Sequence, residues 1–344
     1  MRTFSIFLVS FLVTYLSTPL FRKLATGLKI LDLPGPRKIH KSATPLLGGV
    51  AIYLGLLSGF LLSLKNLYSL TAILIGATVV MIIGLVDDII GLSATFRLVC
   101  QLIIALIISI FVVRISFLPS SLWGDIGEII ITVIWIVGLT NAYNCLDGLD
   151  GLAAGSAVIN LFCFVVILYN TKQYSLVILA IILMGACLGF IPYNFKRAKI
   201  FLGDAGSTFI GFTLASIALL GNWAEDNIVK ITIPVLILGV PIFDMVFTTI
   251  MRIKEVKVKT FMEWLQYGGK DHFHHYLVDL GLRPLGAVVF IYFITLSLGI
   301  SAIMVGNDQA IEAFLTLSQA AIIFGVIAVL MVAGKKRHSG WGGE

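Results

Sequence analysis

The acidic residues of this chain are few, and many of them lie in short motifs at the ends of apolar segments. Six are candidates for chemistry: Asp87, Asp88, Asp147, Asp150, Asp204 and Asp244. A charged side chain at the centre of a bilayer costs about 2.5–3.5 kcal/mol, so six unpaired carboxylates would cost about 15–20 kcal/mol, more than a typical folding free energy. We therefore expect them to lie near the membrane interface, to meet cations, or both. Because hard divalent cations bind carboxylate oxygens, the set points to metal-assisted phosphate chemistry.

Two motifs carry acids that are close together in the sequence. Asp87 and Asp88 are adjacent in GLVDDIIG, where a solvated acidic helix end is the alternative to a metal or phosphate site. In NAYNCLDGLDG, Asn144, Asp147 and Asp150 recur every three residues, which places them on one face if the segment is helical. The intervening glycines permit close approach of a ligand, so this motif favours a binding site over a plain helix start.

A third motif, IPYNFKRAKIFLGDAGS, combines cations with an acid. Lys196, Arg197 and Lys199 follow Asn194, and Asp204 precedes a predicted apolar helix. Helix N-termini and nearby cations attract phosphate, and a metal ion would let the carboxylate share that site. The pattern GxxxxGK[ST] of a nucleotide-binding P-loop is absent from the sequence, so another kind of phosphate site is indicated.

Three of the five histidines lie together in GGKDHFHHYL, at His272, His274 and His275. Imidazole groups can bind diphosphate or transfer protons. No cysteine is near, which disfavours a structural zinc site. A basic run ending at Lys41 adds cations from the first long polar segment.

The elements that must position these residues are membrane helices. Of the 344 residues, 59% are hydrophobic and 12% are charged, which excludes an ordinary soluble enzyme, a disordered chain and a disulfide scaffold. A span needs about 20 apolar residues. Eleven candidate spans predict an all-α, polytopic integral membrane protein, and they cover about 3–21, 47–64, 69–86, 97–117, 126–143, 152–169, 175–193, 206–222, 229–250, 285–305 and 311–333.

The positive charges are distributed unevenly between the two faces that these spans define. Nineteen of the 24 Lys and Arg residues fall on the face that also carries the acidic motifs and the histidines. The positive-inside rule makes that face cytoplasmic, with the N-terminus outside and the C-terminus in the cytoplasm.

Five motifs occur in the order of a known family. They are D-x-P-x-x-R-K-x-H at 32–40, VDD at 86–88, NAYNCLDGLDG, FLGDAGS and DHFHHYL. With them, the chain resembles the polyprenyl-phosphate N-acetylhexosamine-1-phosphate transferases, of the glycosyltransferase 4 type, over about residues 1–305. It looks closest to the undecaprenyl-phosphate N-acetylglucosamine-1-phosphate transferase branch.

The resemblance implies one integral-membrane catalytic domain over residues 1–344, with active-site segments at about 22–46, 87–97, 144–151, 194–207 and 251–284. It implies transfer of N-acetylglucosamine-1-phosphate from UDP-N-acetylglucosamine to undecaprenyl phosphate, with release of UMP. This is a first membrane step of cell-envelope glycan synthesis, such as cell-wall or lipopolysaccharide synthesis. It further implies dependence on Mg²⁺, with Mn²⁺ as a substitute, and a multi-pass protein of the inner (plasma) membrane with a cytoplasmic active site. No nucleic acid is expected as a partner, and a homodimer is left open.

The resemblance also implies roles for individual residues. Asp204 would ligate Mg²⁺, and Asp87 or Asp88 would deprotonate the lipid phosphate or attack first. The remaining site residues would contact the donor: Asn144, Asp147, Asp150 and Asn194 the nucleotide region, Phe201 the uracil, and Lys41, His272, His274 and His275 the diphosphate and sugar, with Arg252 added to the substrate-binding candidates.

Several alternatives remain at this point. The main alternative is another donor, either UDP-muramoyl-pentapeptide or another UDP-N-acetylhexosamine. The muramoyl-pentapeptide branch typically has three consecutive histidines, whereas Phe273 interrupts them here. A CDP-alcohol phosphatidyltransferase needs DGxxAR, and the sequence DGLDGL at 147–152 lacks the Ala-Arg pair. A cation-coupled transporter would need polar residues at mid-bilayer, and the outer half of the predicted spans is almost wholly apolar.

Overall fold

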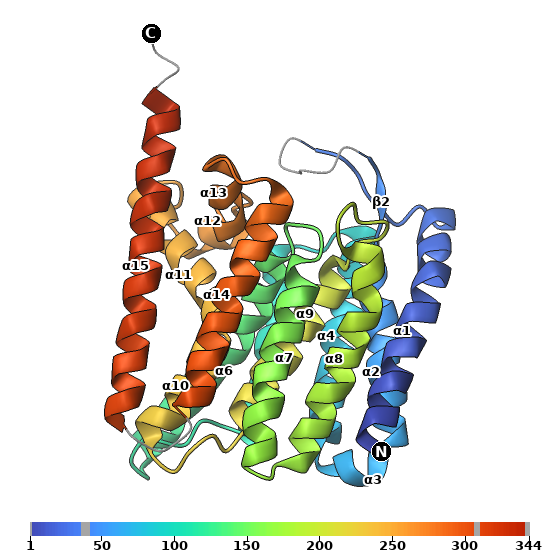
Figure 1. Ribbon diagram of the computed structural model, residues 1–344, viewed down its shortest axis with the longest axis vertical. Coiled ribbons are helices and arrows are strands. Elements are labelled where there is room, and N and C mark those ends of the chain that lie inside the picture. The colour runs from blue at the N-terminus through green and yellow to red at the C-terminus, as the bar shows by residue number, and fades with distance from the viewer. Residues whose placement is uncertain (1, 36–41, 306–309, 341–344) are drawn as a thin grey trace.

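Helices dominate the computed structural model, which describes residues 2–35, 42–305 and 310–340 (Figure 1). The long helices are α1 (Arg2–Gly27), α2 (Gly48–Leu62), α4 (Thr71–Ile90), α5 (Ala94–Phe111), α6 (Leu122–Leu146), α7 (Leu152–Asn170), α8 (Tyr174–Asn194), α9 (Gly203–Leu220), α10 (Asn227–Ile237), α11 (Gly239–Lys254), α14 (Pro284–Met304) and α15 (Ala310–Gly340). The short elements are strands β1 (Leu31–Asp32) and β2 (Thr44–Pro45), helices α3 (Leu64–Leu67), α12 (Phe261–Gln266) and α13 (Phe273–Asp279), and the 3₁₀ turn η1 (Tyr68–Leu70).

Each of the eleven predicted apolar segments is helical over most of its length. Within the described ranges, nine helical segments are long and apolar enough to cross a membrane, and the pair α10–α11, bent by 80°, would make ten. The remaining segment, α2, is apolar but has only 15 residues. The prediction of a helical, multi-pass membrane protein is confirmed, apart from one short strand pair, whereas the count of eleven spans and the orientation of the termini stay predictions.

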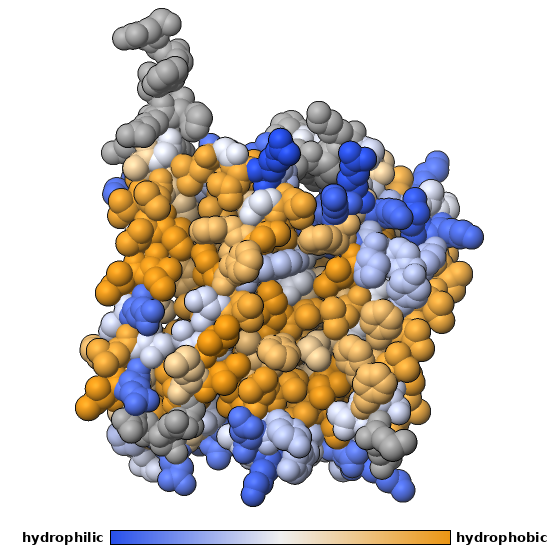
Figure 2. Space-filling model, in the orientation of Figure 1, coloured by the Kyte–Doolittle hydropathy of each residue, from blue (hydrophilic) through white to orange (hydrophobic). Residues whose placement is uncertain are grey.

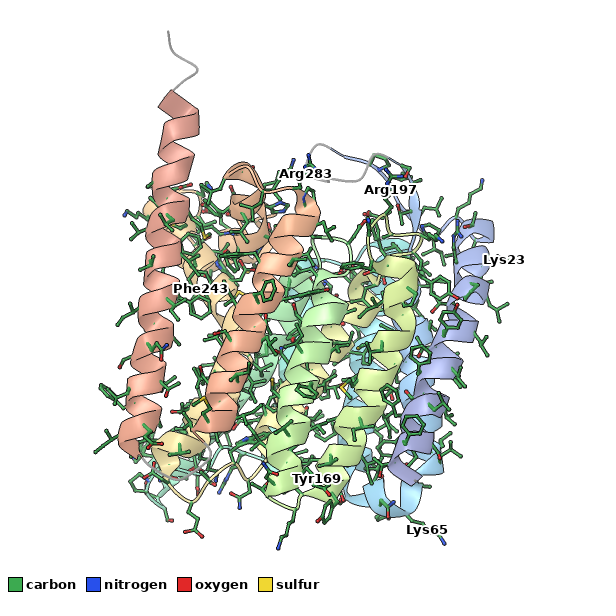
Figure 3. All side chains as sticks on the ribbon, viewed as in Figure 1. Lys23, Lys65, Tyr169, Arg197, Phe243 and Arg283 are labelled. Atoms are coloured by element: carbon green, nitrogen blue, oxygen red, sulfur yellow. The ribbon has the colours of Figure 1, made fainter. Side chains whose placement is uncertain are left out.

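Polarity divides the molecule into a belt and two ends. On the face shown in Figure 2, apolar side chains predominate over the middle, and most hydrophilic residues gather at the two ends. Lys23, Arg197 and Arg283 lie at one end of the bundle, and Lys65 lies at the other (Figure 3). This arrangement is what a bilayer around the apolar belt requires.

Helix α9 is the central element that carries the site. It packs against α2, α4 and α6, and most of its residues are buried. Small residues along it, such as Gly206, Ser207, Gly211 and Ala215, let neighbouring helices approach closely. Asp204 lies in its first turn.

The loop between α1 and α2, called the N-terminal loop below, contains a short antiparallel strand pair and contacts the segment before α9. Strand β1 pairs with β2, with Leu31 opposite Pro45. The backbone N–H of Phe201 donates to the Pro45 carbonyl at 2.8 Å, and the N–H of Gly48 donates to the Phe201 carbonyl at 3.0 Å. Phe201 is thereby fixed between the N-terminal loop and the start of α9.

Candidate active site

A cavity of about 780 Å³ opens at the basic end of the bundle. Its walls come from the N-terminal loop, α4, the α6–α7 loop, the α8–α9 loop, α13 and α14. The predicted site residues that line it are Asp88, Asn144, Asp147, Asp150, Asn194, Phe201, Asp204 and His275. Residues as far apart in the chain as Asp32 and Val288 thus meet around one space.

Other predicted site residues lie elsewhere. Asp87, Arg252, His272 and His274 do not line this cavity. Lys41 lies outside the described residues, so its predicted contact with the diphosphate stays a prediction.

The carboxylate of Asp88 is bound to the first turn of α9. The backbone N–H groups of Asp204 and Ala205 donate to its two oxygens at 2.8 and 3.0 Å. Gly203 makes this approach feasible, since its φ of +74° suits glycine and a Cβ there would lie 2.5 Å from Asp88 Oδ2. Asp88 therefore faces the cavity and satisfies otherwise unpaired amides of a helix N-terminus.

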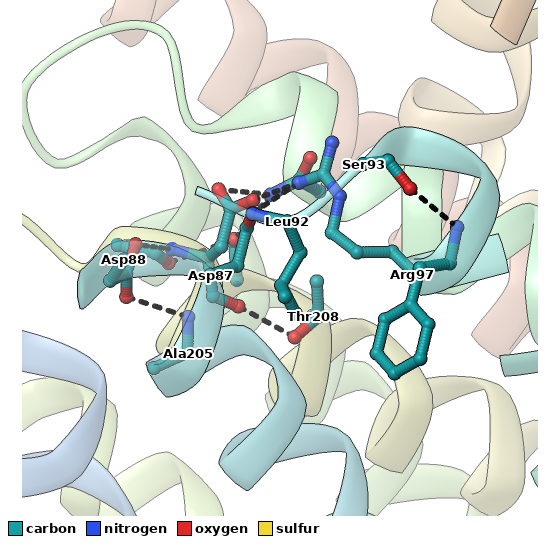
Figure 4. A network of polar contacts seen from close by, with 12 residues as sticks. Asp87, Asp88, Leu92, Ser93, Arg97, Ala205 and Thr208 are labelled. Carbon is teal, nitrogen blue, oxygen red and sulfur yellow. Dashed lines mark hydrogen bonds and ion pairs between the residues drawn. The ribbon is translucent and has the colours of Figure 1, made fainter. Parts of the chain in front are cut away.

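Asp87 points to a different neighbour. Its Oδ1 accepts from the backbone N–H of Leu92 at 2.6 Å, and its Oδ2 pairs with Arg97 at 2.6 Å. Arg97, which Figure 4 shows beside Asp87, also contacts Asp204, so one guanidinium joins the two carboxylates. The adjacent aspartates thus have separate environments, as the 100° turn between neighbouring helix residues requires.

Asn144 and Asp147 complete the acidic wall. Asn144 Nδ2 donates to Asp204 Oδ1 at 2.9 Å and to Ser207 Oγ at 3.0 Å. Among the described residues, the Asp147 carboxylate has no hydrogen-bond or ion-pair partner. Burial, and then the nearby negative charges of Asp204 and Asp88, raise its pKa well above the usual range. Among the described residues, the cavity lining holds five aspartates against two cations, and a bound cation would offset the excess negative charge.

The side chains of Asp150 and Asn194 line the cavity and also form hydrogen bonds with backbone groups of the neighbouring loops. Asp150 Oδ2 accepts from the N–H groups of Arg197 and Ala198 at 3.1 and 2.8 Å. Asn194 accepts from the N–H of Gly151 at 2.9 Å and donates to the Ile200 carbonyl at 3.0 Å. The α6–α7 and α8–α9 loops are therefore locked to each other beside the cavity.

This locked loop presents two cations at the cavity. Lys196 and Arg197 both line it, and both have positive φ values, +52° and +75°. Such backbone costs about 1–3 kcal/mol per residue and persists where surrounding contacts determine it, which the Asp150 contacts do here.

The histidines divide into three environments. His275 lines the cavity, and burial lowers its pKa. His274 is 1% exposed, neither ring nitrogen has a partner among the described residues, and burial lowers its pKa to about 3. His272 Nδ1 lies 3.0 Å from Asp244 Oδ2. Of these three histidines, His275 alone is therefore placed to touch a ligand in the cavity.

His274 explains a glycine in the acidic motif. A Cβ on Gly148 would overlap the His274 ring, with Cε1 only 2.6 Å away. We expect Gly148→Ala to push α13 away from the acidic loop, lowering kcat about tenfold or more and destabilising the fold by about 1–3 kcal/mol. Turnover and thermal unfolding measure the two effects.

The matched control is Gly138→Ala in α6, where a Cβ would meet nothing within 4 Å. That variant should retain both activity and stability. A Gly148→Ala enzyme that matches Gly138→Ala in both respects would contradict the packing argument.

Two residues of this region were not among the predicted site residues. Arg97 joins Asp87 to Asp204, and Asp271 pairs with Arg252. The sequence signal for Arg97 is an arginine at the start of an apolar helix, four residues before Gln101. For Asp271 the signal is weaker, because an acid beside histidines is common in solvated loops.

The fold and site define a polytopic membrane protein with a cavity at one end whose aspartates and cations suit a metal ion and phosphate groups. Comparisons with known proteins agree with this class. The family described as glycosyl transferase family 4 matches residues 70–222. A Bacillus subtilis protein named probable undecaprenyl-phosphate N-acetylglucosaminyl 1-phosphate transferase is 37% identical over 306 residues, 87% of this chain and 83% of that protein. The chain belongs to glycosyl transferase family 4.

Two further relatives are named for different sugar donors. A decaprenyl-phosphate N-acetylglucosaminephosphotransferase of Mycolicibacterium smegmatis is 29% identical over 361 residues, 94% of this chain and 86% of that protein. A phospho-N-acetylmuramoyl-pentapeptide-transferase of Geobacillus thermodenitrificans is 35% identical over 241 residues, but these cover only 62% of this chain and 73% of that protein. Similarity to the acetylglucosamine enzymes therefore extends over more of the chain.

Proposed function

We propose that this protein transfers N-acetylglucosamine-1-phosphate from UDP-N-acetylglucosamine to undecaprenyl phosphate and releases UMP. The observation that carries the proposal is the convergence of Asp88, Asp147 and Asp204 with the cations Lys196 and Arg197 around one cavity at the end of a membrane bundle. A donor from water and an acceptor from the bilayer can meet only at such a boundary. Apolar residues of α14 at the same cavity, such as Leu285 and Val288, suit the lipid.

Mg²⁺ fits this cavity as the cofactor. Its acidic wall offers hard oxygen ligands, and Asp147 has no partner of its own among the described residues. In that part of the chain, no group of three or more His, Cys, Asp or Glu is arranged to hold a metal by itself. Mg²⁺ commonly binds through one or two carboxylates and completes its shell with substrate phosphates and water. We assign Asp204 as the ligand, with Asp147 beside it and Mn²⁺ as a substitute.

The chain's own residues then bind, orient and exclude water. In the net reaction an oxygen of the lipid phosphate bonds to the β-phosphorus of the donor, and the bond from that phosphorus to the bridging oxygen breaks, leaving UMP. A bound Mg²⁺ would neutralise charge on the transferring phosphate. Asp88 would receive the lipid phosphate, either accepting its proton or attacking first, and Phe201 would stack on uracil. His275 and Lys41 would contact the diphosphate and sugar, with Lys196 and Arg197 at the rim.

Donor choice is the experiment that tests this function. We expect purified protein with undecaprenyl phosphate to release UMP from UDP-N-acetylglucosamine, with kcat/KM at least about a hundredfold above that for UDP-glucose. A site that hydrogen-bonds the acetamido group leaves buried polar groups unpaired when the analogue lacks it.

The UDP-muramoyl-pentapeptide is the third donor in this comparison. Segment 251–284 carries the apolar residues Phe261, Met262 and Trp264 before the histidines, so we expect little turnover of a donor that bears a long polar peptide. Equal use of the pentapeptide donor would reject the acetylglucosamine assignment while keeping the family. No UMP from any UDP-sugar would reject the function.

The proposed location is the inner membrane, with the active site in the cytoplasm and the N-terminus outside. Single cysteines at the exposed positions Glu225 and Lys259, in a variant without the four native thiols, test this topology. In intact cells, an impermeant maleimide should label position 225 and should reach position 259 only after lysis. Labelling of 259 from outside would invert the proposed orientation.

A further inference from the structure

Four charged or titratable side chains lie in or against the histidine segment, none more than 12% exposed, and do not line the cavity. Asp244 is completely buried and lies 3.0 Å from His272 Nδ1 through its Oδ2. Arg252 donates to both oxygens of Asp271 at 2.9 Å, and both side chains are less than a tenth exposed. The Arg252 guanidinium also lies 4.9 Å from the centroid of the Tyr267 ring.

These contacts come from a single stripe of α11. Asp244, Thr248 and Arg252 are spaced four residues apart, so they share one face of that helix. Asp244 Oδ1 accepts from the backbone N–H of Phe273 at 2.5 Å, and Thr248 Oγ1 donates to the Asp271 carbonyl at 3.1 Å. Side chains from consecutive turns of α11 therefore bind residues 271–273 through hydrogen bonds and ion pairs.

The charges of this cluster balance. Burial alone would lower the pKa of His272, but its hydrogen bond to Asp244 and the negative charge of that carboxylate, together with Cys145, raise it to about 11. An imidazolium with Asp244 and a guanidinium with Asp271 form two neutral pairs. Removing one partner of a buried pair is strongly destabilising, whereas replacing a whole pair by apolar side chains is often neutral. The cluster is thus better explained by the geometry that it fixes than by stability alone.

That geometry extends to the cavity within one helical turn. His272 is the residue before α13, and His275 lies in the first turn of that helix, at the cavity wall. His274, between them, packs against Gly148 of the acidic loop. The position of His275 relative to the carboxylates therefore depends on where α11 holds residues 271–273.

We infer that Asp244, with His272, Thr248, Arg252 and Asp271, forms a positioning cluster that places His275 against the transferred phosphate group. The inference rests on the proposed function and assigns His272 and Arg252 to orientation rather than to contact with substrate. A displacement of about 1 Å at a positioned group can lower turnover about a hundredfold.

The test is a double-mutant cycle between Asp244 and His275. We expect Asp244→Asn to lower kcat about 10- to 100-fold with a much smaller change in the KM for UDP-N-acetylglucosamine. If Asp244 acts through His275, then Asp244→Asn should cost little further activity in a His275→Asn enzyme. Additive losses would overturn the inference, because a purely structural defect does not depend on His275.

Glu128→Gln is the matched control at the opposite end of the bundle. Glu128 is likewise a buried carboxylate that pairs with an arginine, Arg114, and accepts a backbone N–H, that of Leu118. This variant should keep the wild-type kcat. An equal loss of kcat in Glu128→Gln and Asp244→Asn would also overturn the inference.

Hydrogen–deuterium exchange separates this inference from the proposed function. Exchange in the peptide around Phe273 should rise in Asp244→Asn and stay unchanged in Glu128→Gln, whether or not the protein uses UDP-sugars. Unchanged exchange in both variants would refute the anchor itself, whereas absence of UMP release by the wild type would refute only the function. If Asp244→Asn does not fold, Thr248→Val, which removes one hydrogen bond to Asp271, replaces it in both measurements.

Discussion

Replacing Asp204 by Asn is expected to lower turnover on the order of a thousandfold while the protein stays folded. Asp204 lies at the cavity, where its carboxylate contacts Arg97 and Asn144. Loss of its charge removes the assigned Mg²⁺ ligand, and electrostatic stabilisation of a transferring phosphate is usually the largest catalytic contribution. The fold should persist because Asp88 still binds the first amides of α9 and Arg97 still pairs with Asp87.

UMP release over a Mg²⁺ titration, together with thermal unfolding, measures both parts of this expectation. Asp226→Asn is the matched control, since Asp226 also lies at a helix N-terminus but at the start of α10, where it accepts from the N–H groups of Ile228 and Val229. Its Asn variant keeps an acceptor there and should be fully active. An Asp204→Asn enzyme with near wild-type turnover would reject the metal assignment.

The helical architecture was predictable because the apolar segments carry it directly. A run of about 20 apolar residues in a bilayer must form its hydrogen bonds internally, so it becomes a helix wherever its neighbours lie. The bend of 80° between α10 and α11 was predictable only as a break near Pro234 and Pro241, not as an angle. The short helix α2 shows the same limit, because apolar composition does not define how far a segment crosses.

The gathering of the site was predictable in part. The acids and cations of separate loops were expected on one face, and many of them line one cavity. The direction of each side chain was not predictable, because it depends on helix rotation and on partners distant in sequence. Asp150 is an example: its carboxylate binds the amides of residues 197 and 198, 47 and 48 positions away. Arg252 is another, since its pairing with Asp271 needs the chain to turn back along α11.

The two adjacent aspartates of α4 are expected to respond very differently to mutation. Asp88 faces the cavity and accepts two backbone amides of α9. Asn at this position would keep one acceptor and turn an NH₂ group toward a backbone N–H, while removing the charge proposed to handle the lipid phosphate. We therefore expect Asp88→Asn to lose activity by more than about a hundredfold.

Asp87→Asn should cost only about tenfold, because Asp87 acts on the cavity through Arg97, which keeps its contact with Asp204. The two kcat values, compared at equal amounts of folded protein, measure the difference, and equal, mild losses would contradict it.

Exchange of labelled UMP into UDP-N-acetylglucosamine without lipid phosphate then defines the role of Asp88. Attack by its carboxylate on the β-phosphorus would form an acyl phosphate and release UMP, so the wild type would catalyse exchange and Asp88→Asn would not. If Asp88 only accepts the proton of the lipid phosphate, neither enzyme catalyses exchange, because no bond to phosphorus breaks before the acceptor arrives.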